Sequence, residues 1–173
     1  MASKRVLITG ASSGIGEAAA KRYGASGAHV LLLARNAERL DDVAETIRRA
    51  GGSAAPYPVD LSDASAIAET GARIEREVGT PDILINNAGA GRWLPLVETM
   101  AEEALQMIEV PYLAAFNLTR AVLPEMLARR SGAIACITSP ASYLVWPNAS
   151  AYIAARRADQ RPTVPEQIGR AHV

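Results

Sequence analysis

Residues 9–16, with the sequence TGASSGIG, constrain the fold of this chain more than any other segment. They follow a short apolar run at residues 6–9 that is typical of a buried strand, and they open an alanine-rich stretch at residues 14–25 that is typical of a helix. Glycine permits a tight turn and lets backbone N–H groups approach a phosphate without an intervening Cβ. A helix N-terminus adds unpaired donors and partial positive charge. Because a strand precedes this turn and a helix follows it, the segment predicts a site for a dinucleotide pyrophosphate.

Strand-like and helix-like segments alternate along the rest of the chain. Apolar runs predict further strands at residues 30–33, just before Val59, at 83–85 and at 133–137. Helical spacing predicts three further helices. The first begins after Asn36, which caps it, and the second covers residues 63–78. The third extends over about 99–130, where Pro111 should introduce a kink. The apolar side of this last helix is predicted to hold Leu105, Ile108, Tyr112, Ala115, Thr119, Val122 and Met126. The alternation predicts an α/β fold with right-handed crossovers, a parallel sheet and helices on both faces.

Composition excludes several classes of partner. Eighteen basic residues balance eighteen acidic ones, so electrostatics gives no reason to expect a nucleic acid or an anionic membrane as partner. We find no apolar run long enough to span a membrane, and because the first residues run directly into a strand, no signal peptide is expected. Cys136 is the only cysteine, which predicts a reducing, cytoplasmic location. With two histidines in the chain, no metal site is expected.

Three motifs together resemble the short-chain dehydrogenase/reductase family over roughly residues 4–157. They are TGASSGIG, the sequence NNAG at residues 86–89, and a serine, Ser139, thirteen residues before Tyr152. The resemblance implies a Rossmann-type doubly wound sheet, a nicotinamide cofactor, and hydride transfer between an alcohol and a carbonyl. The cofactor-binding residues that it implies are Gly10, Ser12, Ser13, Gly14, Ile15, Gly16, Asn86, Ala88 and Gly89.

The residues after the second strand favour NADP over NAD. Ala34 stands where NAD-type members of the family usually have an acidic residue, and Arg35 comes next. A guanidinium suits a 2′-phosphate in charge and in geometry, and Ser12 and Ser13 add hydroxyl donors. The alternative is that Arg35 only solvates the start of a helix. Asp60 resembles the family residue that contacts adenine, although it also suits the capping of a helix, and both roles are compatible.

The resemblance also implies a catalytic set of Ser139, Tyr152 and position 156. In the family, a tyrosine gives a proton to the substrate, a serine holds the substrate oxygen, and a lysine four residues later lowers the pKa of the tyrosine and holds the nicotinamide ribose. Here position 156 is Arg156, one helical turn from Tyr152. Arginine keeps the positive charge that favours tyrosinate, but it does not deprotonate. The alternative for Tyr152 is a half-buried aromatic residue of the core.

A second departure is Pro111, which occupies the position of a family asparagine that supports a proton-relay water. Proline keeps a kink but has no side-chain hydrogen bond to offer. The two departures leave open whether the chain is a divergent active enzyme or an inactive one. Around the site, Ser142 and Tyr143 are near but lack the family spacing, and Trp93 and Trp146 either wall an apolar substrate or cap the core. Cys136 is expected in the core, and His29 is expected to be exposed without a partner.

The C-terminal part departs from the alternating pattern. Residues 156–173 are polar, contain two prolines and have no strand or helix period. We therefore expect residues 1–158 to form a dinucleotide-binding domain that is incomplete at the C-terminus, and residues 159–173 to be a non-native or disordered tail. The ending IGRAHV resembles a translated sequencing-library adapter, and a genuine short tail is the alternative. Without a sixth strand, one sheet edge is exposed and the substrate pocket is incomplete, so we expect the chain as written to be poorly soluble or inactive.

Three functions remain open from the sequence. The first is an NADP-dependent oxidoreductase acting on a small-molecule alcohol or carbonyl, with a full-length parent that forms a homo-oligomer. The second is a dinucleotide-binding module without catalysis, which Pro111, Arg156 and the missing strands favour. The third is an interaction fragment whose long amphipathic helix pairs with its own copy.

Overall fold

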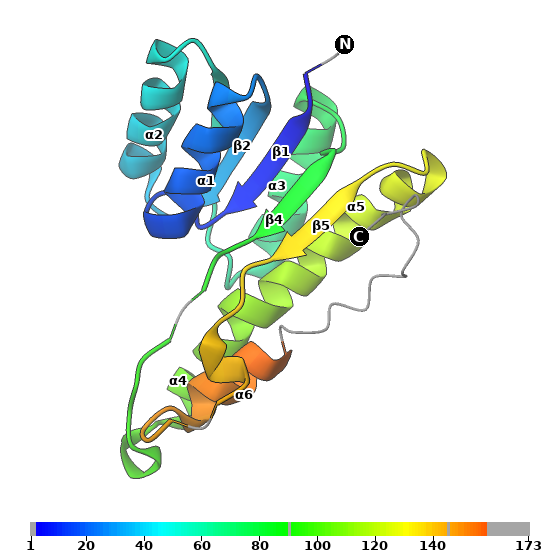
Figure 1. Ribbon diagram of the computed structural model, residues 1–173. Coiled ribbons are helices and arrows are strands. Elements are labelled where there is room, and N and C mark those ends of the chain that lie inside the picture. Colours follow the sequence, from blue (N-terminus) through cyan, green and yellow to red (C-terminus); the bar gives the residue numbers. More distant parts are fainter. Residues whose placement is uncertain (1–2, 90, 145, 159–173) are drawn as a thin grey trace.

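A parallel sheet lies at the centre of the computed structural model, which describes residues 3–89, 91–144 and 146–158 (Figure 1). Within these residues the sheet has five strands in the order β3-β2-β1-β4-β5. Every neighbouring pair is parallel. The strands are β1 (Arg5–Thr9), β2 (His29–Ala34), β3 (Ser53–Pro58), β4 (Ile83–Asn86) and β5 (Ala133–Cys136). This order confirms the predicted Rossmann-type fold.

Helices cover both faces of the sheet, so the predicted double winding is also confirmed. The helices are α1 (Gly14–Ala25), α2 (Ala37–Arg49), α3 (Ala64–Glu77), α4 (Ala101–Ile108), α5 (Ala114–Ala128) and α6 (Ser150–Ala158). Alternate residues of β1 point to opposite faces. Val6 and Ile8 pack in the core that α1 and α2 cover, whereas Leu7 packs in the core beneath α3 and α5.

Side-chain caps determine where α2 and α3 begin. The Asn36 side chain accepts a hydrogen bond from the Arg39 backbone N–H at 2.9 Å, which confirms the predicted cap of α2. The cap of α3 is Asp63, whose carboxylate accepts bonds from two backbone N–H groups of the first turn. The capping role suggested for Asp60 is therefore wrong, because Asp63 caps this helix.

The long helical region is interrupted at Pro111, as expected. A π-helical segment, η2 (Glu109–Leu113), joins α4 to α5, and Pro111 is buried within it. Proline cannot donate the backbone bond that a regular helix needs at this position, and the wider π turn accommodates that loss. The segment therefore divides the expected helix into two.

The buried side of this region agrees with the prediction only in part. The side chains that point into the core are Met107, Ala114, Leu118, Val122 and Met126, with Pro111 between them. Leu105, expected on the buried side, is 54% exposed. Val122 and Met126 are buried as predicted. Leu105 was placed wrongly because this region also carries apolar residues on a second face, where Leu113 and Phe116 are exposed. Hydrophobic periodicity therefore identified the face that meets the sheet only in part.

Two smaller expectations are corrected. His29 opens β2, is half-buried, and its Nδ1 lies 2.6 Å from the Ser53 hydroxyl on the neighbouring strand, so it has a partner. Cys136 ends β5 and is half-buried, with its Sγ 3.8 Å from Asn86 Nδ2. It lies on the edge strand of the described sheet, where one side is less covered than in the centre.

The α6 helix lies beyond the carboxyl ends of the strands, beside α4 (Figure 1). A short 3-10 turn, η3 (Pro140–Ser142), leads from β5 toward it, and a second, η1 (Leu96–Glu98), precedes α4. Ala141, Ala149 and Ile153 form a small separate core there, with Tyr152 packed against it. Among the described helices, none is long and apolar enough to cross a membrane. The tail predicted at residues 159–173 lies outside the described residues.

Candidate active site

The glycine-rich turn adopts backbone conformations that explain its sequence. It joins β1 to α1, and Gly10 and Gly14 have φ angles of +65° and +56°. A Cβ on Gly10 would lie 2.9 Å from Asn87 Nδ2, and a Cβ on Gly16 would collide with the Gly10 carbonyl oxygen. Gly14 has open space where its Cβ would be. The turn is therefore closed on its inner side by packing and open on its outer side, which suits a bound phosphate.

A second segment, residues 86–89, supports this turn from the neighbouring strand. The buried Thr9 hydroxyl accepts hydrogen bonds from the backbone N–H groups of Asn87 and Ala88, both at 2.9 Å. The Asn87 amide in turn donates to the Thr9 carbonyl at 2.9 Å. Thr9 and Asn87 were not singled out from the sequence, although both lie inside recognised motifs. They hold the two motifs at a fixed separation.

Asn86 takes a different position from its neighbours. It is 5% exposed, and its Nδ2 donates to the Thr119 hydroxyl of α5 at 3.3 Å. Its side chain therefore lies between the sheet and α5, whereas Asn87, Ala88 and Gly89 line the open cavity. Asn86 is placed to join β4 to α5 beneath the cavity floor.

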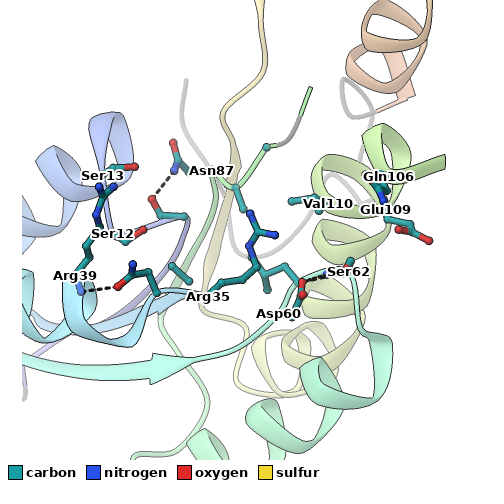
Figure 2. A pocket seen from close by; sticks show the side chains of 16 residues that line it. Ser12, Ser13, Arg35, Arg39, Asp60, Ser62, Asn87, Gln106, Glu109 and Val110 are labelled. Atoms are coloured by element: carbon teal, nitrogen blue, oxygen red, sulfur yellow. Dashed lines mark hydrogen bonds between the residues drawn. The ribbon is translucent and has the colours of Figure 1, made fainter. Parts of the chain in front are cut away.

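These motifs border a cavity of about 650 Å³ at the carboxyl edge of the sheet (Figure 2). The structure brings together most of the residues predicted to bind the cofactor. The lining includes Gly10, Ser12, Ser13, Arg35, Asp60, Ala88 and Gly89. Gly14, Ile15 and Gly16 form the first turn of α1 beside it, where Ile15 is 65% exposed. The cavity lies at the point where strand order reverses between β1 and β4, which is where ligands bind in open parallel sheets.

Two arginines border this cavity, and the sequence prediction included only one of them. Arg35 follows β2 and extends across the cavity toward Asp60 (Figure 2). Arg39 comes from the first turn of α2, and its side chain points toward Ser12 and Ser13 in the same view. Arg39 lies in the first turn of the helix that Asn36 caps, directly after the second strand, so its closeness to the end of that strand could have been recognised from the sequence.

Asp60 is held in its ionised form. The Ser62 backbone N–H and the Ser62 hydroxyl donate to its Oδ1 at 3.0 and 2.8 Å. The bond from the backbone N–H, followed by the bond from the hydroxyl, lowers the pKa of Asp60. Burial raises this pKa, and the nearby Arg35 charge lowers it. The Asp60 carboxylate thus offers a fixed acceptor at the far side of the cavity.

Ser139, Tyr152 and Arg156 are brought together as the sequence predicted. Ser139 caps η3, accepting the Ala141 backbone N–H at 3.2 Å, and its side chain also hydrogen-bonds with Tyr152. Arg156 Nε donates to the Tyr152 hydroxyl at 3.3 Å. Burial alone would raise the pKa of Tyr152, but the bonds with Ser139 and Arg156 and the guanidinium charge outweigh it and lower this pKa. The cluster therefore favours a tyrosine that exchanges its proton readily.

Arg156 also connects this cluster to the cavity. Its Nη1 donates to the Ile137 carbonyl at 3.4 Å, just after β5. A Cβ on Gly89 would collide with the same guanidinium, so the backbone of the cofactor motif and this side chain are in direct contact. The guanidinium therefore contacts both the tyrosine hydroxyl and the backbone that borders the cavity.

The other side chains near the cluster have distinct places. Ser142 is buried and donates to the Ser139 carbonyl, whereas Tyr143 is 75% exposed. Trp93 and Trp146 come from different loops, yet their ring centres are 5.8 Å apart. Because these rings are 54% and 42% exposed, they do not cap the core.

Comparison with known proteins identifies relatives along nearly all of the described chain. A family model described as short chain dehydrogenase matches residues 4–161. A short chain dehydrogenase of Pseudocercospora fijiensis is 38% identical, and a fatty acyl-CoA reductase of Acinetobacter baylyi is 40% identical, each over 157 residues. These alignments cover 90% of this chain but 51% and 53% of the two relatives. The chain thus spans about half the length of the curated relatives it matches.

Solved structures with the same fold contain both kinds of nicotinamide cofactor. A metagenomic short-chain oxidoreductase in complex with NADP superimposes with a TM-score of 0.87 at 37% identity, covering 90% of this chain and 71% of that one. A 7α-hydroxysteroid dehydrogenase complexed with NADH and 7-oxo glycochenodeoxycholic acid has a TM-score of 0.86 at 29% identity, covering 90% and 61%. The choice of cofactor must therefore be argued from the residues of this chain.

Proposed function

The chain belongs to the short-chain dehydrogenase family, and from this premise we propose that it is part of an NADP-dependent oxidoreductase that interconverts an alcohol and a carbonyl. The observation that carries the proposal is the position of Arg156. Its guanidinium contacts both the Tyr152 hydroxyl and the Gly89 backbone at the cavity wall. A proton donor and a dinucleotide cavity are thus adjacent, which is the arrangement that hydride transfer to a carbonyl requires.

The residues that line the cavity support a dinucleotide with a 2′-phosphate. Gly14 leaves open space at the start of α1, where backbone N–H groups are free to meet a pyrophosphate. Arg35 and Arg39, together with the hydroxyls of Ser12 and Ser13, surround the part of the cavity next to β2. The side chain at the end of β2 is that of Ala34, so no carboxylate opposes the phosphate there. These groups support NADP over NAD.

The protein side of the reaction follows from the hydrogen bonds of Tyr152. When bound, the nicotinamide supplies or accepts the hydride. In carbonyl reduction the Tyr152 hydroxyl gives its proton to the substrate oxygen, and the Ser139 hydroxyl holds that oxygen by a hydrogen bond. The Arg156 charge stabilises the tyrosinate that results. Because arginine does not lose its own proton, Tyr152 must regain a proton from solvent by another route.

A second candidate function is dinucleotide binding without catalysis. Pro111 offers no side-chain donor or acceptor, and the Arg156 guanidinium occupies space directly against Gly89. Both features favour a site that holds a cofactor but turns over slowly. The two functions differ in whether Tyr152 affects a rate.

Calorimetric titration with NADPH and NADH, followed by ketone reduction assays on the full-length protein of which this chain is part, tests the proposal. We expect NADPH to bind more tightly than NADH, and Tyr152→Phe to abolish ketone-dependent NADPH oxidation without weakening NADPH binding. Tyr143→Phe, at an exposed tyrosine nearby, should leave both unchanged. Binding with a rate that Tyr152→Phe does not alter would favour the non-catalytic function, and absence of binding by either cofactor would refute both.

We extend the proposal to the setting of the protein. The single cysteine is consistent with a reducing cytoplasm. The exposed apolar side chains of Leu113, Phe116 and Leu127 on the α5 region are suited to a contact between two copies of the chain. If that contact forms a homo-oligomer, light scattering should give a lower molecular mass in solution for Phe116→Glu than for the unaltered chain.

A further inference from the structure

The chain has two tryptophans, and both lie in one cluster beside Tyr152. Trp93 belongs to the loop after β4, and Trp146 to the segment between η3 and α6. Besides its contact with Trp146, Trp93 has its ring centre 6.5 Å from that of Tyr152. We call Trp93 and Trp146 the aromatic wall. Two separate loops thus deliver the largest planar side chains of the chain to the same side of the proton donor.

The geometry around Tyr152 separates a polar end from an apolar side. At the polar end, the hydroxyl bonds with Ser139 and Arg156. At the apolar side, the Gly91 backbone packs on the Tyr152 ring so closely that a Cβ there would collide with it. Trp93 follows two residues later. When the substrate oxygen lies at the Tyr152 hydroxyl, the groups attached to the reacting carbon are therefore within reach of the aromatic wall.

The aromatic wall is partly covered and partly open. Its rings are 54% and 42% exposed and tilted by 50° to one another, so each indole keeps surface available to a further ring. The nearest charged side chain in the sequence, Arg92, is paired with Glu103 at 2.7 Å. The wall thus offers aromatic surface next to a hydroxyl that is hydrogen-bonded for proton transfer.

We propose that the aromatic wall selects an alcohol or carbonyl substrate that carries a planar aromatic ring on, or one bond from, the reacting carbon. This inference rests on the proposed function and names its substrate class. Planar rings stack against indole in offset or edge-to-face geometry, a gain beyond the burial of apolar area. A saturated group with the same number of carbon atoms gains only from burial.

Two ketones matched in carbon number test the substrate class. Acetophenone has a planar ring, whereas cyclohexyl methyl ketone has a puckered saturated ring on the same carbonyl. Each is titrated by calorimetry into the full chain saturated with oxidised NADP, which cannot deliver a hydride to the ketone. We expect acetophenone to bind about tenfold more tightly, from one or two aromatic contacts. Trp93→Leu, which keeps an apolar side chain, should reduce this preference to about twofold.

Matched variants and separate readouts keep the outcomes distinct. Tyr143→Leu removes an exposed aromatic ring from the same segment as Trp146 and should retain the full preference. Equal affinity for the two ketones, or a preference that survives both Trp93→Leu and Trp146→Leu, would overturn the inference. Tighter binding of straight-chain 2-octanone than of acetophenone would also overturn it. The NADP titration that precedes these experiments reports separately on the proposed function.

Discussion

Removal of the Arg156 charge by Arg156→Gln is the sharpest test of how Tyr152 is activated. The Nε atom lies 3.3 Å from the tyrosine oxygen. At that distance two unit charges interact by about 5 kcal/mol at an effective dielectric of ~20, and by about 1 kcal/mol in bulk water. Because Tyr152 is half-buried, water screens the pair, and the loss is that of one hydrogen bond to a charged group, about 1.5–3 kcal/mol. We therefore expect alcohol oxidation to slow by roughly ten- to a hundredfold at neutral pH.

The pH profile of the same variant identifies the cause of that loss. Alcohol oxidation needs tyrosinate, so its rate rises with pH as Tyr152 loses its proton. Burial raises the pKa of Tyr152, but the hydrogen bonds with Ser139 and Arg156 and the Arg156 charge lower it overall. Removing the charge therefore raises this pKa, and the pH at which the oxidation rate increases becomes higher. The assay is NADP reduction at saturating alcohol across pH, with NADP affinity measured in parallel. Arg156→Lys should restore most of the rate and return the rise toward its original pH.

A profile that stays in place in Arg156→Gln, with NADP affinity unchanged, would refute this account. Loss of rate at all pH values without a shift would mean that Arg156 positions Tyr152 by contact, through packing on the ring at 5.4 Å, and not by charge. Failure of Arg156→Lys to restore the rate would have the same meaning.

Three further predictions concern the cofactor turn, cofactor choice and alkaline stability. Arg35→Glu should weaken NADP binding by ten- to a hundredfold in calorimetry, because a charge-assisted phosphate bond is lost, while NAD binding should not weaken. Gly16→Ala should lower the free energy of unfolding by about 1–3 kcal/mol in urea titration, because its Cβ meets a backbone oxygen, whereas Gly71→Ala, in open space on α3, should raise it slightly. Burial, followed by the bond to Glu77, raises the pKa of Tyr57 to about 12 from 10.0. Because the folded-state pKa of Tyr57 lies above its unfolded value, the contribution of Tyr57 to stability is present below pH 10 and is lost as pH rises toward 12. Tyr57→Phe should therefore reduce the decrease in the free energy of unfolding over this pH range.

The parts of the fold that were predicted well are those determined by local sequence. The turn from β1 to α1 needs glycine at Gly10 and Gly14 because of positive φ angles, so its sequence signature is strong. The Asn36 cap is likewise a contact between near neighbours in sequence. Both could be identified without knowing what else the chain packs against.

Features that depend on distant segments were less predictable. The buried face of α4 and α5 depends on which of two apolar faces meets the sheet, and the exposed Leu105 and Phe116 resemble core residues in sequence. Thr9 and Asn87 bond across 78 positions, and local spacing carries no sign of that contact. The convergence of Trp93 and Trp146 depends in the same way on two loops that only the folded sheet brings together.

The two departures from the family pattern, Pro111 and Arg156, lie on elements that touch each other. The π-helical segment that contains Pro111 packs against α6, which carries Tyr152 and Arg156. A proton relay through an asparagine-bound water requires the side chain at position 156 to exchange a proton, and a guanidinium does not. Once position 156 is arginine, an asparagine at position 111 has no relay to support. Arg156 instead reaches the Ile137 carbonyl and the Tyr152 hydroxyl by its own donors, so the tyrosine is held by direct bonds. Under the proposed function the two departures are therefore physically consistent, and solvent at the half-buried hydroxyl would renew the Tyr152 proton.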